Sequence, residues 1–311
     1  MASVLPAPET MGVVDEATAR LLRRATVASV AVAAGLVIVK LGAWLLTDSV
    51  SLLSTLIDSL LDVAASFLNL LAVRHALAPP DREHRFGHGK AEPLAGLGQA
   101  TFITGSAIFL LFEAGQRLFD PQPVVRPGLG IAVMVLSIVV TFGLTRFQRY
   151  VVKRTGSVAI SADSLHYVGD LLTNVAVIVA IVLTSQFGWM YADPLLAIVI
   201  AVYILRMAWG ISNGALDMLM DRELPDEERR RIKQVVLEHP GVIALHDLKT
   251  RTAGPTSFIQ LHIEMDGELR LKEAHRIADE VEEALRAAFP NAEVVIHQDP
   301  FGLETPRVVE P

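Results

Sequence analysis

Cysteine is missing from the 311 residues, so the chain can form no disulfide and can offer no thiolate to a metal. Histidine, aspartate and glutamate are the side chains left for that purpose. Nitrogen and oxygen donors of this kind suit zinc, ferrous iron, cobalt or manganese better than cuprous ion.

Charge is scarce as well, since 20% of the residues are charged and 52% are hydrophobic. A soluble domain of this length usually carries more charge and fewer long apolar runs, so the composition predicts a membrane protein. The net charge of −7 is spread along the chain, and no basic tract indicates binding to nucleic acid. Residues 1–18 lack the basic start of a cleavable signal peptide, which predicts a short flexible tail.

Six apolar stretches are each long enough to cross a bilayer, whose core needs about 20 consecutive, mostly apolar residues. They run at roughly 25–46, 50–73, 93–117, 128–150, 158–185 and 193–213. We therefore expect a six-helix transmembrane domain over residues 19–215. An even number of crossings puts both termini on one side of the membrane. Arginine and lysine gather before the first stretch and after the second and fourth, which predicts cytoplasmic termini.

The composition changes from about Asp221 onward, where short alternating segments replace the long apolar runs. Acids and a proline open a helix after residue 224, and Ile259, Leu261 and Ile263 alternate with polar residues as in a half-buried strand. Strands are expected near 242–252, 257–266 and 292–297, and a second helix near 271–288. This order predicts a small cytoplasmic α+β domain of αββαβ type over residues 216–300, followed by a tail over 301–311.

Two of the apolar stretches carry polar residues three or four apart, so each set lies along one helix face. The sets are Ser51, Thr55, Asp58, Asp62, Ser66 and Asn69 in the second stretch, and Asp163, His166, Asp170 and Asn174 in the fifth. An ionisable side chain at mid-membrane costs about 2.5–3.5 kcal/mol on insertion scales, so its presence calls for a partner. Asp58 with Asp62 and His166 with Asp170 are i, i+4 pairs, which together can give four donors to one tetrahedral divalent ion.

A proton relay, or polar helix–helix contacts without metal, would also place acids inside the bilayer. Three neighbouring carboxylates without a cation would repel one another, whereas a bound divalent ion relieves that repulsion. Metal ligands must be deprotonated, so metal binding expels protons and protons can drive its release. The residues favour a metal site and leave the relay as an alternative.

Two further groups of histidines and acids have metal-binding spacing. In the loop after the second stretch, Asp81, His84 and His88 form either a three-ligand site or a solvated loop with no such role. In the C-terminal part the candidates are His246, His262, His275, His297 and Asp299. Histidines scattered over a surface would give the same count, so the residues leave both alternatives open.

Five separated segments together resemble the cation diffusion facilitator family, in particular its bacterial zinc and ferrous-iron efflux pumps. They are Leu56–Asp62, Phe86–Glu92, Ala162–Asp170, Leu219–Arg222 and Ile296–Pro300, and the resemblance covers about residues 20 to 300. It implies a homodimer in a bacterial inner membrane that exchanges a metal ion for protons by alternating access. It also implies a metallochaperone-like, ferredoxin-like fold for the soluble domain.

The resemblance carries the family's sites onto this chain by position. The transport site maps onto Asp58, Asp62, His166 and Asp170, the loop site onto Asp81, His84 and His88, and the cytoplasmic binuclear site onto His246, His262, His275, His297 and Asp299. A charge lock between subunits is expected to involve Lys90 and Asp221. The ion is expected to be zinc, with cadmium or ferrous iron as alternatives.

Two other classes of protein compete with a transporter. An intramembrane metalloprotease would need a His-Glu-x-x-His motif or its inverse, and the sequence has neither, so we expect no enzyme. A membrane-tethered metal sensor would use the soluble domain alone and would leave the polar faces of the second and fifth stretches unexplained.

Overall fold

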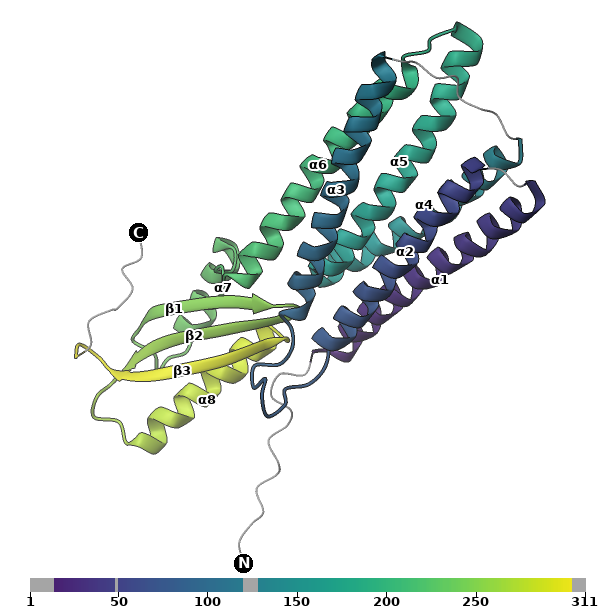
Figure 1. The fold of residues 1–311 in the computed structure, drawn as a ribbon. Helices are drawn as coiled ribbons and strands as arrows, with labels where there is room; N and C mark the ends of the chain where they lie inside the picture. The colour runs from purple at the N-terminus through teal and green to yellow at the C-terminus, as the bar shows by residue number, and fades with distance from the viewer. Residues whose placement is uncertain (1–13, 48–49, 120–127, 304–311) are drawn as a thin grey trace, which may run out of the picture. The chain divides into compact units, whose positions relative to one another are not determined.

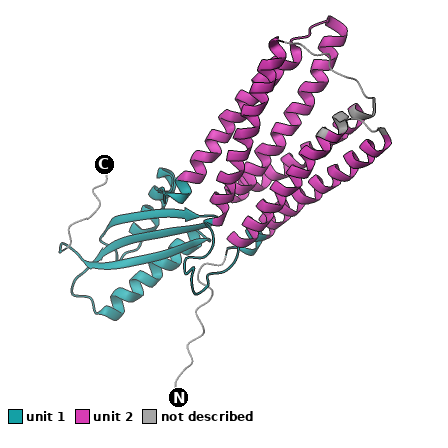
Figure 2. Ribbon diagram, in the orientation of Figure 1, with its two compact units in different colours: residues 1–19, 77–90, 217–311 teal, residues 20–76, 91–216 magenta. Residues whose placement is uncertain are grey.

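The computed structural model describes residues 14–47, 50–119 and 128–303. The chain divides into two compact units (Figure 2). The first comprises residues 1–19, 77–90 and 217–311, and the second comprises residues 20–76 and 91–216. Most of the expected tails and parts of the loops near 47–48 and 120–127 lie outside the described residues.

The second unit is a bundle of six helices (Figure 1). They are α1 (Glu16–Thr47), α2 (Val50–Ala76), α3 (Ala91–Phe119), α4 (Gly128–Thr155), α5 (Val158–Phe187) and α6 (Ala192–Leu219). Among the described residues, all six contain a window apolar enough to cross a membrane. The six expected spans are confirmed, and α1 begins earlier than its apolar run, at Glu16.

Helix α5 lies at the centre of this bundle, because it packs against α2, α3 and α4. The Ser157 side chain caps its start by accepting from the Ile160 backbone N–H at 3.2 Å. Gly188 ends it with a left-handed φ of 64°, and its N–H donates back to the last turn. A Cβ at Gly96 would lie 2.8 Å from Val158 Cγ1, so the missing side chain is what lets α3 approach α5 this closely.

The first unit contains the expected soluble fold, which is confirmed as αββαβ (Figure 1). Its elements are α7 (Asp226–Leu237), β1 (Ala244–Ala253), β2 (Thr256–Met265), α8 (Leu271–Ala288) and β3 (Ala292–Pro300). The sheet order is β1-β2-β3, with β1 antiparallel and β3 parallel to β2. A parallel pair needs a crossover, which α8 supplies.

The two faces of this sheet differ in character. Ile259, Leu261 and Ile263 form the core together with the apolar stripe of α8, which includes Val281 and Leu285. Side chains alternate along a strand, so the residues between them, including His262, face the other side.

The strand register sets three histidines side by side across that other face. His246 on β1 is paired with His262 on β2, and His262 is paired with His297 on β3. The pairing of β1 shifts between His246 and Lys249, where Asp247 has a φ of 49°. A bulge of this kind re-aims the side chains next to it.

Candidate metal-transport site

The cluster inside the helical bundle joins α2 to α5. His166 Nε2 lies 2.9 Å from Asp62 Oδ1 and 3.8 Å from Asp170 Oδ2. Ligand atoms of these three residues all lie within 4.8 Å of one another, close enough to share one metal ion. Asp58, the fourth expected ligand, lines the same cavity of about 860 Å³ but does not belong to this close cluster.

Helix geometry explains this arrangement. Asp58 and Asp62 are one turn apart on α2, and His166 and Asp170 are one turn apart on α5, so each helix offers a pair of ligands on one face. The packing of α2 against α5 then brings the two faces together. All four side chains lie within segments apolar enough to span a membrane, where a bound cation would offset the cost of placing carboxylates.

Lys40 is a functional candidate that the sequence reasoning missed. Its ammonium donates to the Ser59 hydroxyl at 2.6 Å and to the Thr55 carbonyl at 3.2 Å, so it reaches from α1 to the segment of α2 that carries Asp58. The sequence does contain a signal for Lys40, because it is a single charged residue inside a long apolar stretch. An ionisable side chain in the bilayer is costly and so indicates a functional role, as it did for the acids. The structure thus adds one cation near the larger cavity, which Asp58 lines.

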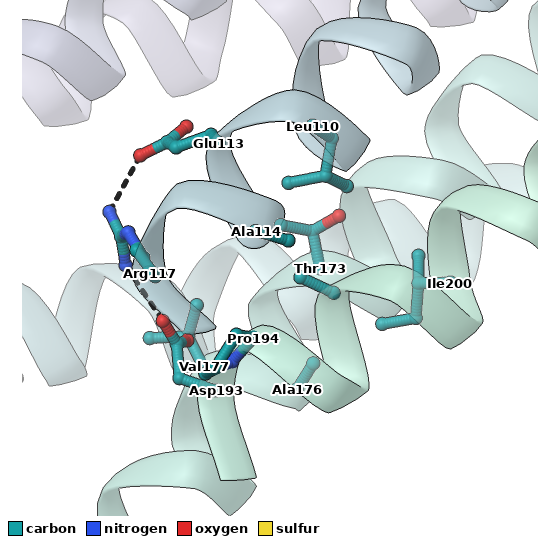
Figure 3. Close-up of a pocket in the computed structure, with 11 residues that line it drawn as sticks. Leu110, Glu113, Ala114, Arg117, Thr173, Ala176, Val177, Asp193, Pro194 and Ile200 are labelled. Carbon is teal, nitrogen blue, oxygen red and sulfur yellow. Dashed lines mark hydrogen bonds and ion pairs between the residues drawn. The ribbon is translucent and has the colours of Figure 1, made fainter. Parts of the chain in front are cut away.

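A second, smaller cavity of about 200 Å³ lies between α3, α5 and α6 (Figure 3). Arg117 spans it with two ion pairs of 2.7 Å, one to Glu113 on its own helix and one to Asp193 on α6. Glu113 lines both this cavity and the larger one. The arginine therefore pairs with an acid that also borders the larger cavity.

The loop candidates form a second cluster, within the first unit. Asp81 lies 3.2 Å from a ring nitrogen of both His84 and His88, and the ligand atoms of all three fall within 4.8 Å of one another. Hydrogen bonds from the backbone N–H groups of His84 and then Glu83 lower the pKa of Asp81. The carboxylate is therefore held in the ionised form that a metal requires.

This loop is anchored to the β1–β2 hairpin. The ring of Phe86 meets that of Phe258 edge-on at 6.0 Å, and the Arg251 guanidinium lies over both rings. A Cβ at Gly89 would fall 2.2 Å from the Ala253 carbonyl oxygen, so only glycine allows this approach.

The third cluster lies on the histidine face of the sheet. His262 Nδ1 is 2.8 Å and His246 Nε2 is 3.4 Å from the buried Asp299 carboxylate, and these three could hold one ion. His297 Nε2 lies 3.1 Å from the other oxygen of Asp299. Two histidines on different oxygens of one carboxylate are the arrangement that a bridged pair of ions would use.

Within one chain the cluster includes Glu264 and does not include His275. Glu264 was not foreseen, yet its carboxylate is 3.0 Å from His246 Nδ1, which leaves Nε2 directed at Asp299. His275 is exposed on α8, 3.6 Å from Asp279, and lies apart from the other four. Helix α8 covers the opposite face of the sheet, so one chain does not bring His275 to the cluster.

Lys90 and Asp221 form an ion pair of 2.9 Å within a single chain. The contact with Lys90 lowers the pKa of Asp221, and Arg251 adds a weaker attraction at 3.4 Å. Asp221 holds a left-handed φ of 56°, which the short side chain of aspartate tolerates better than most. The two residues expected in a lock between subunits are thus paired already in the protomer.

Two families of known domains together cover most of the chain. Residues 26–220 match the cation efflux transmembrane domain, and residues 224–301 match the cation efflux protein cytoplasmic domain. The chain is 50% identical over 281 residues to the cation-efflux pump FieF of Salmonella choleraesuis (strain SC-B67), covering 90% of this chain and 93% of that one. It is 49% identical over 286 residues to FieF of Klebsiella pneumoniae (strain ATCC 700721 / MGH 78578), covering 92% and 95%.

Among solved structures, the Zn form of the transporter CzrB matches with 42% identity and a TM-score of 0.26. It covers 27% of this chain and 98% of CzrB's resolved chain. The two family matches and the full-length relatives settle the class: this is a multi-pass membrane protein that transports a cation and is not an enzyme. The chain belongs to the cation efflux family, which is the cation diffusion facilitator family that its sequence resembles.

Proposed function

We propose that this chain exports a divalent metal ion, zinc foremost, in exchange for protons. The observation that carries the proposal is the close cluster of Asp62, His166 and Asp170 inside membrane-spanning helices, facing a cavity that Asp58 also lines. A family of cation exporters needs a binding point for its cargo within the bilayer, and this cluster has the right donors.

The donor set favours zinc. One imidazole nitrogen and three carboxylate oxygens match the four-coordinate geometry that Zn²⁺ takes in proteins. Cadmium and ferrous iron accept the same donors, so they remain candidates for the same site. No cysteine is present to select a softer ion.

Proton exchange follows from the chemistry of the ligands. Zinc binds deprotonated carboxylates and a neutral imidazole, so its arrival displaces protons and the return of protons displaces zinc. The asymmetry of arginine and lysine supports cytoplasmic termini in a bacterial inner membrane. Alternating access of the cavity to the two sides of the membrane would then couple proton entry to metal efflux.

The clusters outside the helical bundle suit a regulatory role in a homodimer. The match to a cytoplasmic domain named for cation efflux proteins supports a soluble metal-binding domain, and Asp81, His84 and His88 support a loop site. His275 is exposed and apart, so it can join His246, His262, His297 and Asp299 only where two soluble domains meet. Lys90 and Asp221 would lie close to that contact in the proposed lock.

Zinc uptake into proteoliposomes under an imposed pH gradient tests the proposal. We expect the wild-type chain to accumulate zinc and the Asp62→Ala chain to accumulate at least tenfold less, because one of the ligands is gone. Asp266→Ala, at an exposed turn of the soluble unit, is the matched control and should transport normally. Binding of zinc without accumulation by the wild-type chain would contradict a transporter and favour a tethered sensor.

A further inference from the structure

Five of the six transmembrane helices meet at the carboxylate of Asp163. Its Oδ2 accepts from Ser29 Oγ of α1 at 2.5 Å and from Gln148 Nε2 of α4 at 2.7 Å. Its Oδ1 accepts from Gln99 Nε2 of α3 at 3.2 Å and from Ser66 Oγ of α2 at 3.5 Å. Asp163 itself lies on α5 and is fully buried.

This carboxylate is not one of the clustered metal ligands, although it lies on the same stripe of α5. A carboxylate only accepts hydrogen bonds, and here donor groups from four neighbouring helices lie within 3.5 Å of its two oxygens. Burying a carboxylate within a membrane costs free energy, and Asp163 is not among the clustered residues whose metal ion could offset that cost. Its hydrogen bonds instead join α5 to four other helices and so fix the helices relative to one another.

The contacts lie one helical turn from the transport cluster. Ser66 is one turn beyond Asp62 on α2, and Asp163 is one turn before His166 on α5. Ser66 also shares a 2.7 Å hydrogen bond with the Tyr167 hydroxyl, and the Tyr167 ring packs on that of His166 at 5.5 Å. Ser66 and Asp163, which are joined to each other, therefore lie next to the 2.9 Å contact between Asp62 and His166.

We propose that Asp163 is a positioning residue of the transport site, which holds α2 and α5 at the rotation and register that its metal ligands need. The inference rests on the proposed function, because it assigns Asp163 to that same site. Metal–ligand distances vary by only about 0.2 Å, so a small slip between the two helices changes how well a given ion fits. Asp163 thereby sets affinity and the preference between ions of different size, while it touches none of them.

Transport by the full-length chain in proteoliposomes, measured with Zn²⁺ and Cd²⁺ on the same preparations, tests this. Ser66→Ala removes one donor and is expected to fold, and Asp163→Asn replaces two acceptor sites by an amide. Both should raise KM for zinc by up to about tenfold, less than the 10- to 100-fold that loss of a group bonded directly to a metal ligand typically causes. Both should also shift the ratio of the KM values for zinc and cadmium, which does not depend on the folded fraction.

Ser137→Ala is the matched control, since Ser137 is also buried in α4 but, among the residues that the structure describes, its hydroxyl bonds only to Val133 of its own helix at 2.9 Å. Unchanged KM values for both ions in Ser66→Ala, with only a lower melting temperature, would overturn the inference and leave Asp163 a structural contact. Should Asp163→Asn fail to fold, Ser66→Ala decides alone. No zinc uptake by the wild-type chain would instead contradict the proposed function.

Discussion

His166 Nε2 lies 2.9 Å from Asp62 Oδ1, although 104 residues separate the two along the chain. The contact joins the fifth helix to the second in the interior of the bundle, where Asp170 adds a second carboxylate. Asp58 is more exposed and stands outside this close group. The four ligands proposed for transport are therefore unequal before any metal binds.

Because Asp62 lies in the close cluster and Asp58 does not, we expect two isosteric substitutions on α2 to weaken zinc binding by different amounts. Asp62→Asn removes a charge from the close cluster and should weaken zinc binding by about 100-fold or more. Asp58→Asn removes a carboxylate that would have to move toward the other three ligands to bind the ion. It should therefore weaken zinc binding less, by about tenfold. Titration calorimetry of the full-length chain with zinc measures both, and equal losses would contradict the ranking.

A second prediction concerns Lys40, whose ammonium is within electrostatic reach of Asp58 and Asp170. Lys40→Met removes a positive charge that competes with a divalent ion for these acids. We expect zinc to bind roughly tenfold more tightly, the size of effect that one charge has in partly buried surroundings. Lys40→Arg keeps the charge and serves as the matched control in the same calorimetric titration. Weaker binding by Lys40→Met would show that the ammonium supports the site through α2.

The helices, the strands and the polar faces could be predicted from the sequence because they follow from local periodicity. A run of apolar residues fixes that a helix spans a bilayer, and i, i+4 spacing fixes that Asp58 and Asp62 share a face. Neither says which neighbour that face meets. Asp163 lies on the same stripe as His166, yet the structure turns it toward four other helices.

The same limit applies in the soluble domain. The alternation along β2 predicted that His262 faces away from the core, and the strand register then brought His246 and His297 beside it. That α8 covers the opposite face, and so holds His275 away, depends on the packing of the helix on the sheet. Glu264 was overlooked because an acid in a strand has many ordinary uses.

The pair of Lys90 and Asp221 predicts a pH-dependent contribution to stability. The contact lowers the pKa of Asp221 from its ordinary value of 3.8, so the folded carboxylate loses its proton more readily than the unfolded one. The stabilisation is then present above about pH 4 and is lost as the pH falls through the lower, folded pKa. The group is half-exposed, so the effect should be below about 1 kcal/mol.

Thermal unfolding of Asp221→Asn against the wild-type chain between pH 3 and pH 7 checks this. The mutant should melt at a slightly lower temperature near pH 7, and the two curves should converge as the pH falls toward 3. Asp266→Asn changes an exposed carboxylate that does not pair with Lys90, so it is the control and should follow the wild type throughout. A difference that grows toward low pH would contradict the assignment.

The last prediction concerns Glu264, which holds His246 by its Nδ1 atom at 3.0 Å and so leaves Nε2 for a metal at Asp299. Glu264→Gln keeps the size of the side chain but removes the charge that fixes this tautomer. Substitutions behind a metal-binding histidine typically weaken affinity by about 10- to 100-fold. Zinc titration in an Asp62→Ala background isolates the sites outside the membrane, and Glu268→Gln, at the exposed turn that follows β2, is the matched control. An unchanged zinc affinity in Glu264→Gln would contradict this role of Glu264. The pairing of β1 with β2 at His246 and His262 would then be enough to orient the His246 ring.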